Sequence, residues 1–97
     1  MISSGDIHIA DLNEERGRRV LVISIDRFHR ASGRVLVAPE IVGEPDEVPF
    51  PWRIEVDEVV YAVDLLRSLP IDRLRERVDR APSGAMTRAH QVLANIT

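Results

Sequence analysis

With 97 residues, 44% of them hydrophobic, the chain has the size and composition of one globular domain, and we expect residues 1–97 to form a single unit. The absence of cysteine excludes disulfides and thiolate metal sites, and three scattered histidines without ligand spacing give no case for another metal. The net charge of −3 argues against a generally basic protein that coats nucleic acid, so any polyanion has to be bound locally.

The charges divide along the chain into blocks of opposite sign. The first 15 residues carry four acids and no base, whereas the next stretch, up to residue 34, carries six arginines and one acid. Within the basic block, Arg16, Arg18 and Arg19 flank a glycine, and this arrangement predicts an anion site at the mouth of a strand. The alternative is a solvated basic edge that pairs with Glu14 or Glu15.

The first predicted element is a half-buried strand over residues 5–12, in which polar and apolar side chains alternate. The alternation places Ile7 and Ile9 on one face and His8 on the outer face, at the surface. A polar loop follows and ends at Gly17.

Two similar apolar runs, residues 20–24 and 35–38, form the centre of the chain. Both are rich in β-branched residues, which is typical of strands buried on both faces. The connector, residues 25–32, has room for no more than a turn of helix, which Asp26 would cap. The two runs are therefore expected to pair antiparallel in one small sheet, and Pro39 should end the second because proline cannot donate to a β-ladder.

Residues 40–51 contain three prolines, one glycine and four acids, a composition typical of a loop. Residues 52–57 then alternate between apolar and charged side chains, which predicts an amphipathic strand. Residues 59–66 predict a further buried strand, joined to the previous one through a tight turn near Asp57 and Glu58.

Residues 69–78 fit both a helical and a strand spacing, and the residues alone leave this choice open. The closing segment is clearer, because apolar side chains recur at helical spacing from Met86 to Ile96 and Pro82-Ser83 offers an N-cap. We expect a helix of about three turns across the sheet, with His90 on its inner face.

Five short motifs carry a family resemblance. They are Gly5-Asp6-Ile7, Arg18 to Ser24, Val37-Ala38-Pro39, Val59 to Ser68 and Met86 to Ile96. Together they resemble the MazF/PemK-type toxins of bacterial type II toxin–antitoxin systems. The resemblance implies a mainly β fold with helices, namely a small SH3-like or CcdB-like β-barrel with a C-terminal helix, assembled as a homodimer. It also implies a short turn near Ile71 and then a strand from about Leu74 to Arg80.

The same resemblance implies an endoribonuclease that cleaves single-stranded RNA without a metal or other cofactor, by attack of a 2′-hydroxyl to give a cyclic phosphate. Arg18 matches the family's strand-two arginine, whose planar fork stabilises the charged transition state. Asp64 matches a carboxylate that acts as general base, and burial would make it a stronger base. Its alternative role is that of a buried structural carboxylate. The remaining candidates are expected to bind the RNA: Arg16, Arg19, Arg67, Ser24 and His29.

Three positions depart from the family pattern. Arg19 stands where proline is usual, Ala62 where some members carry an arginine, and Glu40-Ile41-Val42 where threonine-rich residues contact the phosphate. Two further functions therefore stay open: a CcdB-like toxin that binds and poisons a protein target such as gyrase, and a catalytically degenerate homologue that binds an antitoxin.

The sequence also bears on partners and location. A cognate antitoxin is the expected protein partner. No apolar run approaches the roughly 20 residues that a membrane-spanning helix needs. Because the first residues also lack the pattern of a signal peptide, we expect a cytoplasmic protein.

Overall fold

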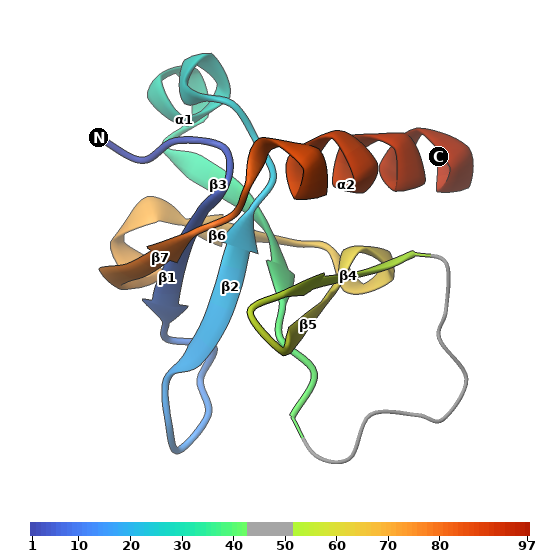
Figure 1. Cartoon of the computed structure of the whole chain (residues 1–97). Coiled ribbons are helices and arrows are strands. Elements are labelled where there is room, and N and C mark those ends of the chain that lie inside the picture. The colour runs from blue at the N-terminus through green and yellow to red at the C-terminus, as the bar shows by residue number, and fades with distance from the viewer. Residues whose placement is uncertain (43–51) are drawn as a thin grey trace.

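The computed structural model of the protein describes residues 1–42 and 52–97, and the fold of this part of the chain is mainly β with two α-helices (Figure 1). This confirms the predicted fold class, while most of the expected 40–51 loop lies outside the described residues. The elements are β1 Asp6–Ala10, β2 Arg18–Val22, α1 Asp26–Ser32, β3 Arg34–Pro39, β4 Arg53–Val56, β5 Val59–Ala62, the short 3₁₀ helix η1 Val63–Leu65, β6 Arg67–Pro70, a second 3₁₀ helix η2 Ile71–Arg73, β7 Leu74–Arg80 and α2 Ser83–Ile96.

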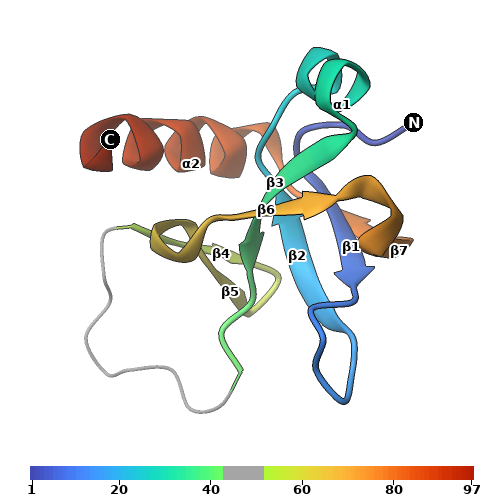
Figure 2. The same ribbon diagram turned by 180° about the vertical axis from the view of Figure 1, so that it is seen from behind.

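Five strands form one antiparallel sheet in the order β6-β3-β2-β1-β7, and β4 and β5 form a hairpin beside it (Figure 2). The expected pairing of the two central runs is confirmed, because β2 and β3 lie antiparallel with Val20 opposite Pro39. β3 ends at Pro39, as predicted. A bridge between Glu40 and Tyr61 then connects the end of β3 to the hairpin.

The sheet carries an apolar layer on each face. On one face, Ile7 and Leu21 pack with residues of the hairpin and of α2. On the other face, Val20 and Val22 belong to a second cluster, against which the N-terminal Ile2 packs. Successive residues of a strand point to opposite faces, so β2 contributes to both layers, and its sequence is therefore apolar from Val20 onward. The polar side chains of β2, Arg18 and Arg19, stand at the start of the strand.

The connector between β2 and β3 contains more helix than expected, because it forms α1, which has 7 residues. Asp26 is the first helical residue and pairs with Arg30 at 3.1 Å, so its predicted role as the cap is wrong. Gly33 ends the helix with a φ of 68°, a conformation that glycine adopts without strain. The additional turn is stabilised by the burial of His29, a tertiary contact that local sequence does not reveal.

The predicted strand over residues 59–66 is wrong in its second half. β5 ends at Ala62, and residues 63–65 turn into η1. Ala62 pairs with Arg53, the first residue of β4, so the ladder of the hairpin ends at this point. Asp64 therefore lies in an exposed turn and not on a buried strand.

The tip of the hairpin confirms the predicted tight turn. Val56 pairs with Val59, and the two residues between them, Asp57 and Glu58, have φ values of 49° and 68°. These values match the type I′ turn that suits the twist of a two-residue hairpin. A hydrogen bond to the Asp79 side chain of β7, together with the negative charge of that group, raises the pKa of the Asp57 carboxyl. The tip of the hairpin thus reaches an edge of the large sheet.

The C-terminal third matches the expectation from the family resemblance, because η2 provides the turn, β7 the strand and α2 the terminal helix. The prediction that His8 lies at the surface is wrong. His8 is only 8% exposed, and its Nδ1 hydrogen-bonds to the Arg75 carbonyl at 2.9 Å, next to an irregularity in the β1–β7 register. The prediction for His90 is confirmed in part: its Nε2 hydrogen-bonds to the Ile23 carbonyl at 3.1 Å, so the ring faces the sheet, but the residue is exposed and does not belong to the core.

Within residues 1–42 and 52–97, both α-helices are too short or too polar to span a bilayer.

The chain has one tyrosine, Tyr61, which is 1% exposed. Its burial predicts that the stability of the fold depends on pH in alkaline solution. The pKa of Tyr61 is raised to about 12, chiefly because the side chain is buried. The positive charge of Arg19 lowers this pKa in part, and the negative charge of Glu40 raises it. An unfolded chain loses the tyrosine proton near pH 10, so we expect the free energy of unfolding to fall as pH rises from about 10 towards 12. The ultraviolet absorbance of tyrosinate measures this single group directly in native and denatured protein.

Tyr61→Phe keeps the ring and removes the titrating hydroxyl, so this variant should lose the pH dependence of stability over the same interval. Native protein in which Tyr61 ionises at the same pH as in denaturant would contradict the prediction.

Candidate functional site

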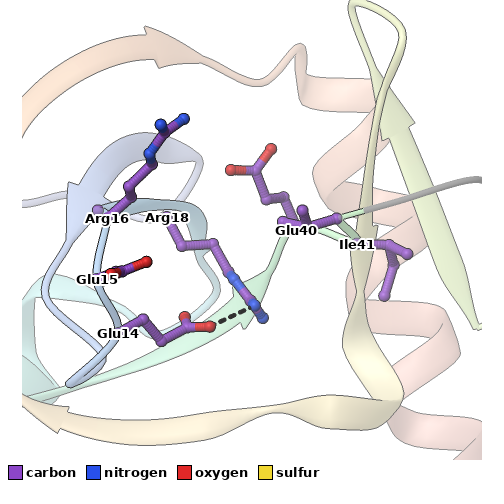
Figure 3. A pocket seen from close by; sticks show the side chains of 8 residues that line it. Glu14, Glu15, Arg16, Arg18, Glu40 and Ile41 are labelled. Carbon is purple, nitrogen blue, oxygen red and sulfur yellow. Dashed lines mark hydrogen bonds and ion pairs between the residues drawn. The ribbon is translucent and has the colours of Figure 1, made fainter.

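A pocket of about 570 Å³ lies between the β1–β2 loop and the end of β3 (Figure 3). One wall comes from the loop and the first residue of β2, and the opposite wall comes from residues that follow β3. Figure 1 shows the loop at the end of the sheet opposite α1. The lining residues are Glu14, Glu15, Arg16, Gly17, Arg18, Glu40, Ile41 and Val42.

The conformation of the β1–β2 loop follows from a few local features. The backbone N–H of Asn13 donates to Asp11 Oδ1 at 2.9 Å, and Asn13 itself has a φ of 62°, which asparagine tolerates better than most residues. Gly17 passes so close to β1 that a Cβ atom there would lie 2.4 Å from Ile9 Cγ2. Only glycine fits this position without displacing Ile9. The loop is thereby held against the sheet, with its charged side chains around the pocket.

Arg18 makes the shortest charged contact in the pocket. Its Nη2 lies 2.6 Å from Glu14 Oε2, and the side chains are 28% and 40% exposed. The alternative drawn from the sequence, a basic edge paired with Glu14 or Glu15, therefore describes part of the site correctly. A pair this exposed contributes about 0–1 kcal/mol to stability. Its importance is geometric, because a carboxylate and a guanidinium are held in direct contact inside a concave site.

Glu40 is fixed from the other side of the pocket. The backbone N–H of Arg19 donates to Glu40 Oε1 at 2.8 Å, and the backbone N–H of Glu40 donates to the Arg19 carbonyl at 3.0 Å. The next residue, Ile41, donates its N–H to the Val60 carbonyl at 2.8 Å. The Arg19 side chain does not line the pocket, because alternation along β2 places it on the face opposite Arg18.

The lining carries three carboxylates and two guanidinium groups, a formal charge of −1. The predicted arginine cluster is thus only partly present: Arg16 and Arg18 share the pocket, and Arg19 contributes backbone atoms. The sequence predicts Glu14 only as a surface ion-pair partner, and it gives Glu40 no role beyond its place where family members carry threonine-rich residues. Glu14 and Arg18 are four residues apart, and this spacing is the one feature of the sequence that could indicate their contact. It usually indicates an ion pair only within a helix.

Asp64 and Arg67 lie elsewhere on the chain. Asp64 Oδ1 is 4.0 Å from Arg53 Nε, and its side chain is 27% exposed, so the burial expected of a general base is missing. Arg67 is exposed at the start of β6, opposite Val37 of β3. Neither residue lines the pocket that contains Arg18.

Ser24 and His29 lie beyond the other end of β2, where they form a buried hydrogen-bond network. His29 Nδ1 is 3.2 Å from the Ile2 carbonyl, which can only accept, so this nitrogen carries the proton. The Ser24 hydroxyl consequently donates to His29 Nε2 at 2.7 Å, while it accepts the Leu36 N–H at 2.9 Å. Every polar atom of the two side chains has a partner, and the network anchors the N-terminal segment and α1. The structure does not bring these residues together with Arg18.

Over residues 1–42 and 52–97, no group of three or more histidine or acidic side chains is placed to hold a metal ion.

The comparisons with known proteins accord with the fold. Residues 3–97 match the family model described as "PemK-like, MazF-like toxin of type II toxin-antitoxin system". A search of curated protein sequences gave no match.

Solved structures with the same fold come from several bacteria. An "Endoribonuclease in complex with its cognate antitoxin from Mycobacterial species" has a TM-score of 0.81 and 15% identity, covering 98% of this chain and 93% of that chain. The "Mycobacterium tuberculosis toxin MazF-mt6" has a TM-score of 0.76 and 20% identity over 93% of each chain. A MazE-MazF crystal structure from Deinococcus radiodurans has a TM-score of 0.81 and 18% identity, covering 98% of this chain and 93% of that chain. At these identities the likeness concerns the fold.

Proposed function

Because the chain belongs to the family of PemK-like, MazF-like toxins of type II toxin–antitoxin systems, we propose that it is an endoribonuclease that cleaves single-stranded RNA without a metal. In this reaction the ribose 2′-oxygen attacks the adjacent phosphorus atom. A bond forms between the 2′-oxygen and phosphorus, the bond from phosphorus to the 5′-oxygen breaks, and a cyclic phosphate and a 5′-hydroxyl result. The reaction needs a base for the 2′-hydroxyl proton and a cation for the developing charge on the phosphate.

The contact between Glu14 and Arg18 is the observation that carries this proposal. The 2′-oxygen and the neighbouring phosphate belong to one nucleotide linkage, so the base and the cation that serve them must themselves be neighbours. Glu14 and Arg18 meet this requirement at 2.6 Å in a pocket open to solvent. Arg18 stabilises the charged phosphate, Glu14 takes the 2′-hydroxyl proton, and water delivers a proton to the departing 5′-oxygen.

Other charged residues have supporting roles in this proposal. Arg16 lines the same pocket, is exposed and has no ion pair with another described residue, so its guanidinium is available to an RNA phosphate. Asp64 is the second candidate for the general base, and Arg19 and Arg67 are further candidates for contacts with the RNA outside the pocket. Ser24 and His29 act on this site only indirectly, through the position of β2.

Protein partners follow from the family. We propose that a cognate antitoxin binds this chain and blocks the pocket, and that two copies assemble as a homodimer in the cytoplasm. A mycobacterial protein of the same fold is described as an endoribonuclease in complex with its cognate antitoxin, which supports the first part of this proposal.

The direct test is cleavage of single-stranded RNA by purified protein in excess chelator. We expect fragments with a 5′-hydroxyl and a cyclic phosphate, no cleavage where the scissile ribose carries a 2′-O-methyl group, and inhibition by the co-expressed antitoxin. Cleavage that disappears in chelator contradicts the metal-free mechanism. A folded protein that cleaves no member of a randomised RNA pool contradicts the ribonuclease proposal itself.

The acid-rich lining of the pocket favours a second candidate function, a toxin that binds a basic surface of a protein target such as gyrase. Growth arrest on expression without RNA cleavage would support this function. An absence of both, with antitoxin binding retained, would instead indicate a catalytically degenerate homologue.

A further inference from the structure

The wall of the pocket opposite the β1–β2 loop has no part in the chemistry proposed for Arg18. It consists of Glu40, Ile41 and Val42, one carboxylate beside two aliphatic side chains. A wall that binds phosphate needs cations or N–H donors, and this wall offers neither on its side chains. We propose that it binds a nucleobase of the substrate and that Glu40 selects guanine, an inference that rests on the proposed ribonuclease function.

The position of the Glu40 carboxylate is fixed before any ligand arrives. Oε1 accepts the Arg19 N–H at 2.8 Å, and a pair of backbone hydrogen bonds holds Glu40 and Ile41 on either side. Figure 3 shows the carboxylate directed towards the side of the pocket that carries Arg16 and Arg18. Because Oε1 is anchored, Oε2 and the remaining lone pair of Oε1 face a ligand with little loss of side-chain entropy.

The chemistry of a carboxylate decides which base it accepts. An ionised carboxylate only accepts hydrogen bonds and has two oxygens in one plane. Guanine presents two neighbouring donors, N1–H and the N2 amino group, on one edge, and these can bind both oxygens at once. Cytosine and adenine each present one amino group, and uracil places a carbonyl oxygen on either side of its N3–H. The order of preference at this position is therefore guanine first and uracil last.

The size and lining of the pocket suit one nucleotide. Its volume of about 570 Å³ lies within the range of about 300–1,000 Å³ that is usual for small-molecule sites. Ile41 and Val42 provide apolar contact for the base, and Arg16 and Arg18 lie across the pocket, where the phosphate would be. The base-binding wall and the phosphate-binding wall are thus separate, and the negative charge of Glu40 does not have to lie against the phosphate.

Glu40→Gln tests the inference because it changes recognition and preserves the structural contact. The amide oxygen of glutamine can still accept the Arg19 N–H, while its NH₂ group replaces the free acceptor. With RNAs that carry each of the four bases next to the scissile linkage, we expect wild-type protein to favour guanine over uracil by about tenfold or more in kcat/KM. In Glu40→Gln this preference should disappear or reverse, because the NH₂ group donates to uracil carbonyls.

Glu15→Gln is the matched control. It removes the same charge from the same pocket, but from the β1–β2 loop and not from the proposed base-binding wall. Thermal unfolding checks that both variants are folded. Unchanged base preference in Glu40→Gln, or an equal change in Glu15→Gln, overturns the inference while the ribonuclease activity stands. To separate the two proposals, the binding of 2′-O-methyl RNAs is measured with the same base series. If these RNAs bind with a preference for guanine but the protein cleaves no unmodified RNA, the result supports base recognition by Glu40 and contradicts the proposed ribonuclease activity.

Discussion

Arg18→Ala is expected to lower kcat for RNA cleavage by about a hundredfold to a thousandfold and to leave the fold intact. Arg18 stands at the first position of β2 with its side chain 28% exposed, so its removal leaves no cavity in either apolar layer. The loss arises because the developing charge on the phosphate would then face Glu14 and Glu15 with only Arg16 to oppose them. Single-turnover cleavage rates and thermal unfolding of the same preparations measure the two parts of this prediction.

Two further variants sharpen the Arg18 experiment. Arg18→Lys keeps the charge and loses the planar fork, so a rate between those of wild type and Arg18→Ala indicates bidentate binding of the phosphate. Arg27→Ala removes the same charge from an exposed position on α1, at the other end of the sheet, and should leave cleavage unchanged. If Arg18→Ala cleaves as fast as wild type, Arg18 is not part of the catalytic site.

The same substitution can be followed in cells. If the chain arrests growth on expression because it cleaves RNA, Arg18→Ala should relieve the arrest while the protein still accumulates. Arrest that persists at wild-type strength with this variant would point to a protein target.

Much of the fold could be predicted because several helices and strands follow from local patterns of residues. The β-branched runs of β2 and β3, the alternation of β4 and the helical period of α2 each depend on a few neighbouring residues. The second half of the predicted 59–66 strand failed for a different reason. Its end depends on where β4 begins, since Ala62 pairs with Arg53, and that register is a tertiary property.

The candidate site was predicted less completely, for reasons of geometry. The family resemblance implies that Arg18 and Ser24 both contact the RNA, yet six residues along an extended strand separate two side chains by roughly 20 Å. That distance places Ser24 with His29 beside α1 and leaves Arg18 at the loop. Glu40 reaches the pocket because β3 pairs with β2 in a register that places Glu40 beside Arg19, and no local pattern of residues indicates that register.

Glu14→Gln is expected to lower kcat by about a hundredfold or more, because the amide cannot take the 2′-hydroxyl proton. The substitution keeps the size of the side chain and a hydrogen-bond acceptor for Arg18, so the β1–β2 loop should retain its conformation. Single-turnover cleavage rates of wild type and Glu14→Gln, together with the affinity for a 2′-O-methyl RNA, check this prediction.

The affinity measurement separates catalysis from positioning. A base that acts only in the chemical step changes kcat and leaves the binding of uncleavable RNA unchanged or tighter, since Arg18 loses an internal competitor for the phosphate. Weaker binding with unchanged kcat would instead mean that Glu14 merely positions Arg18. Faster cleavage by Glu14→Gln would mean that the ion pair holds the site in an inactive state.

Two controls identify which carboxylate acts as the base. Glu15→Gln removes the same charge from the adjacent residue of the loop and should keep most of the wild-type rate. Asp64→Asn tests the carboxylate that the family resemblance suggested. If Asp64→Asn loses cleavage and Glu14→Gln retains it, then Asp64 is the base, and a second copy of the chain must bring it to Arg18. The opposite pattern assigns the proton transfer to the 2.6 Å pair within one chain.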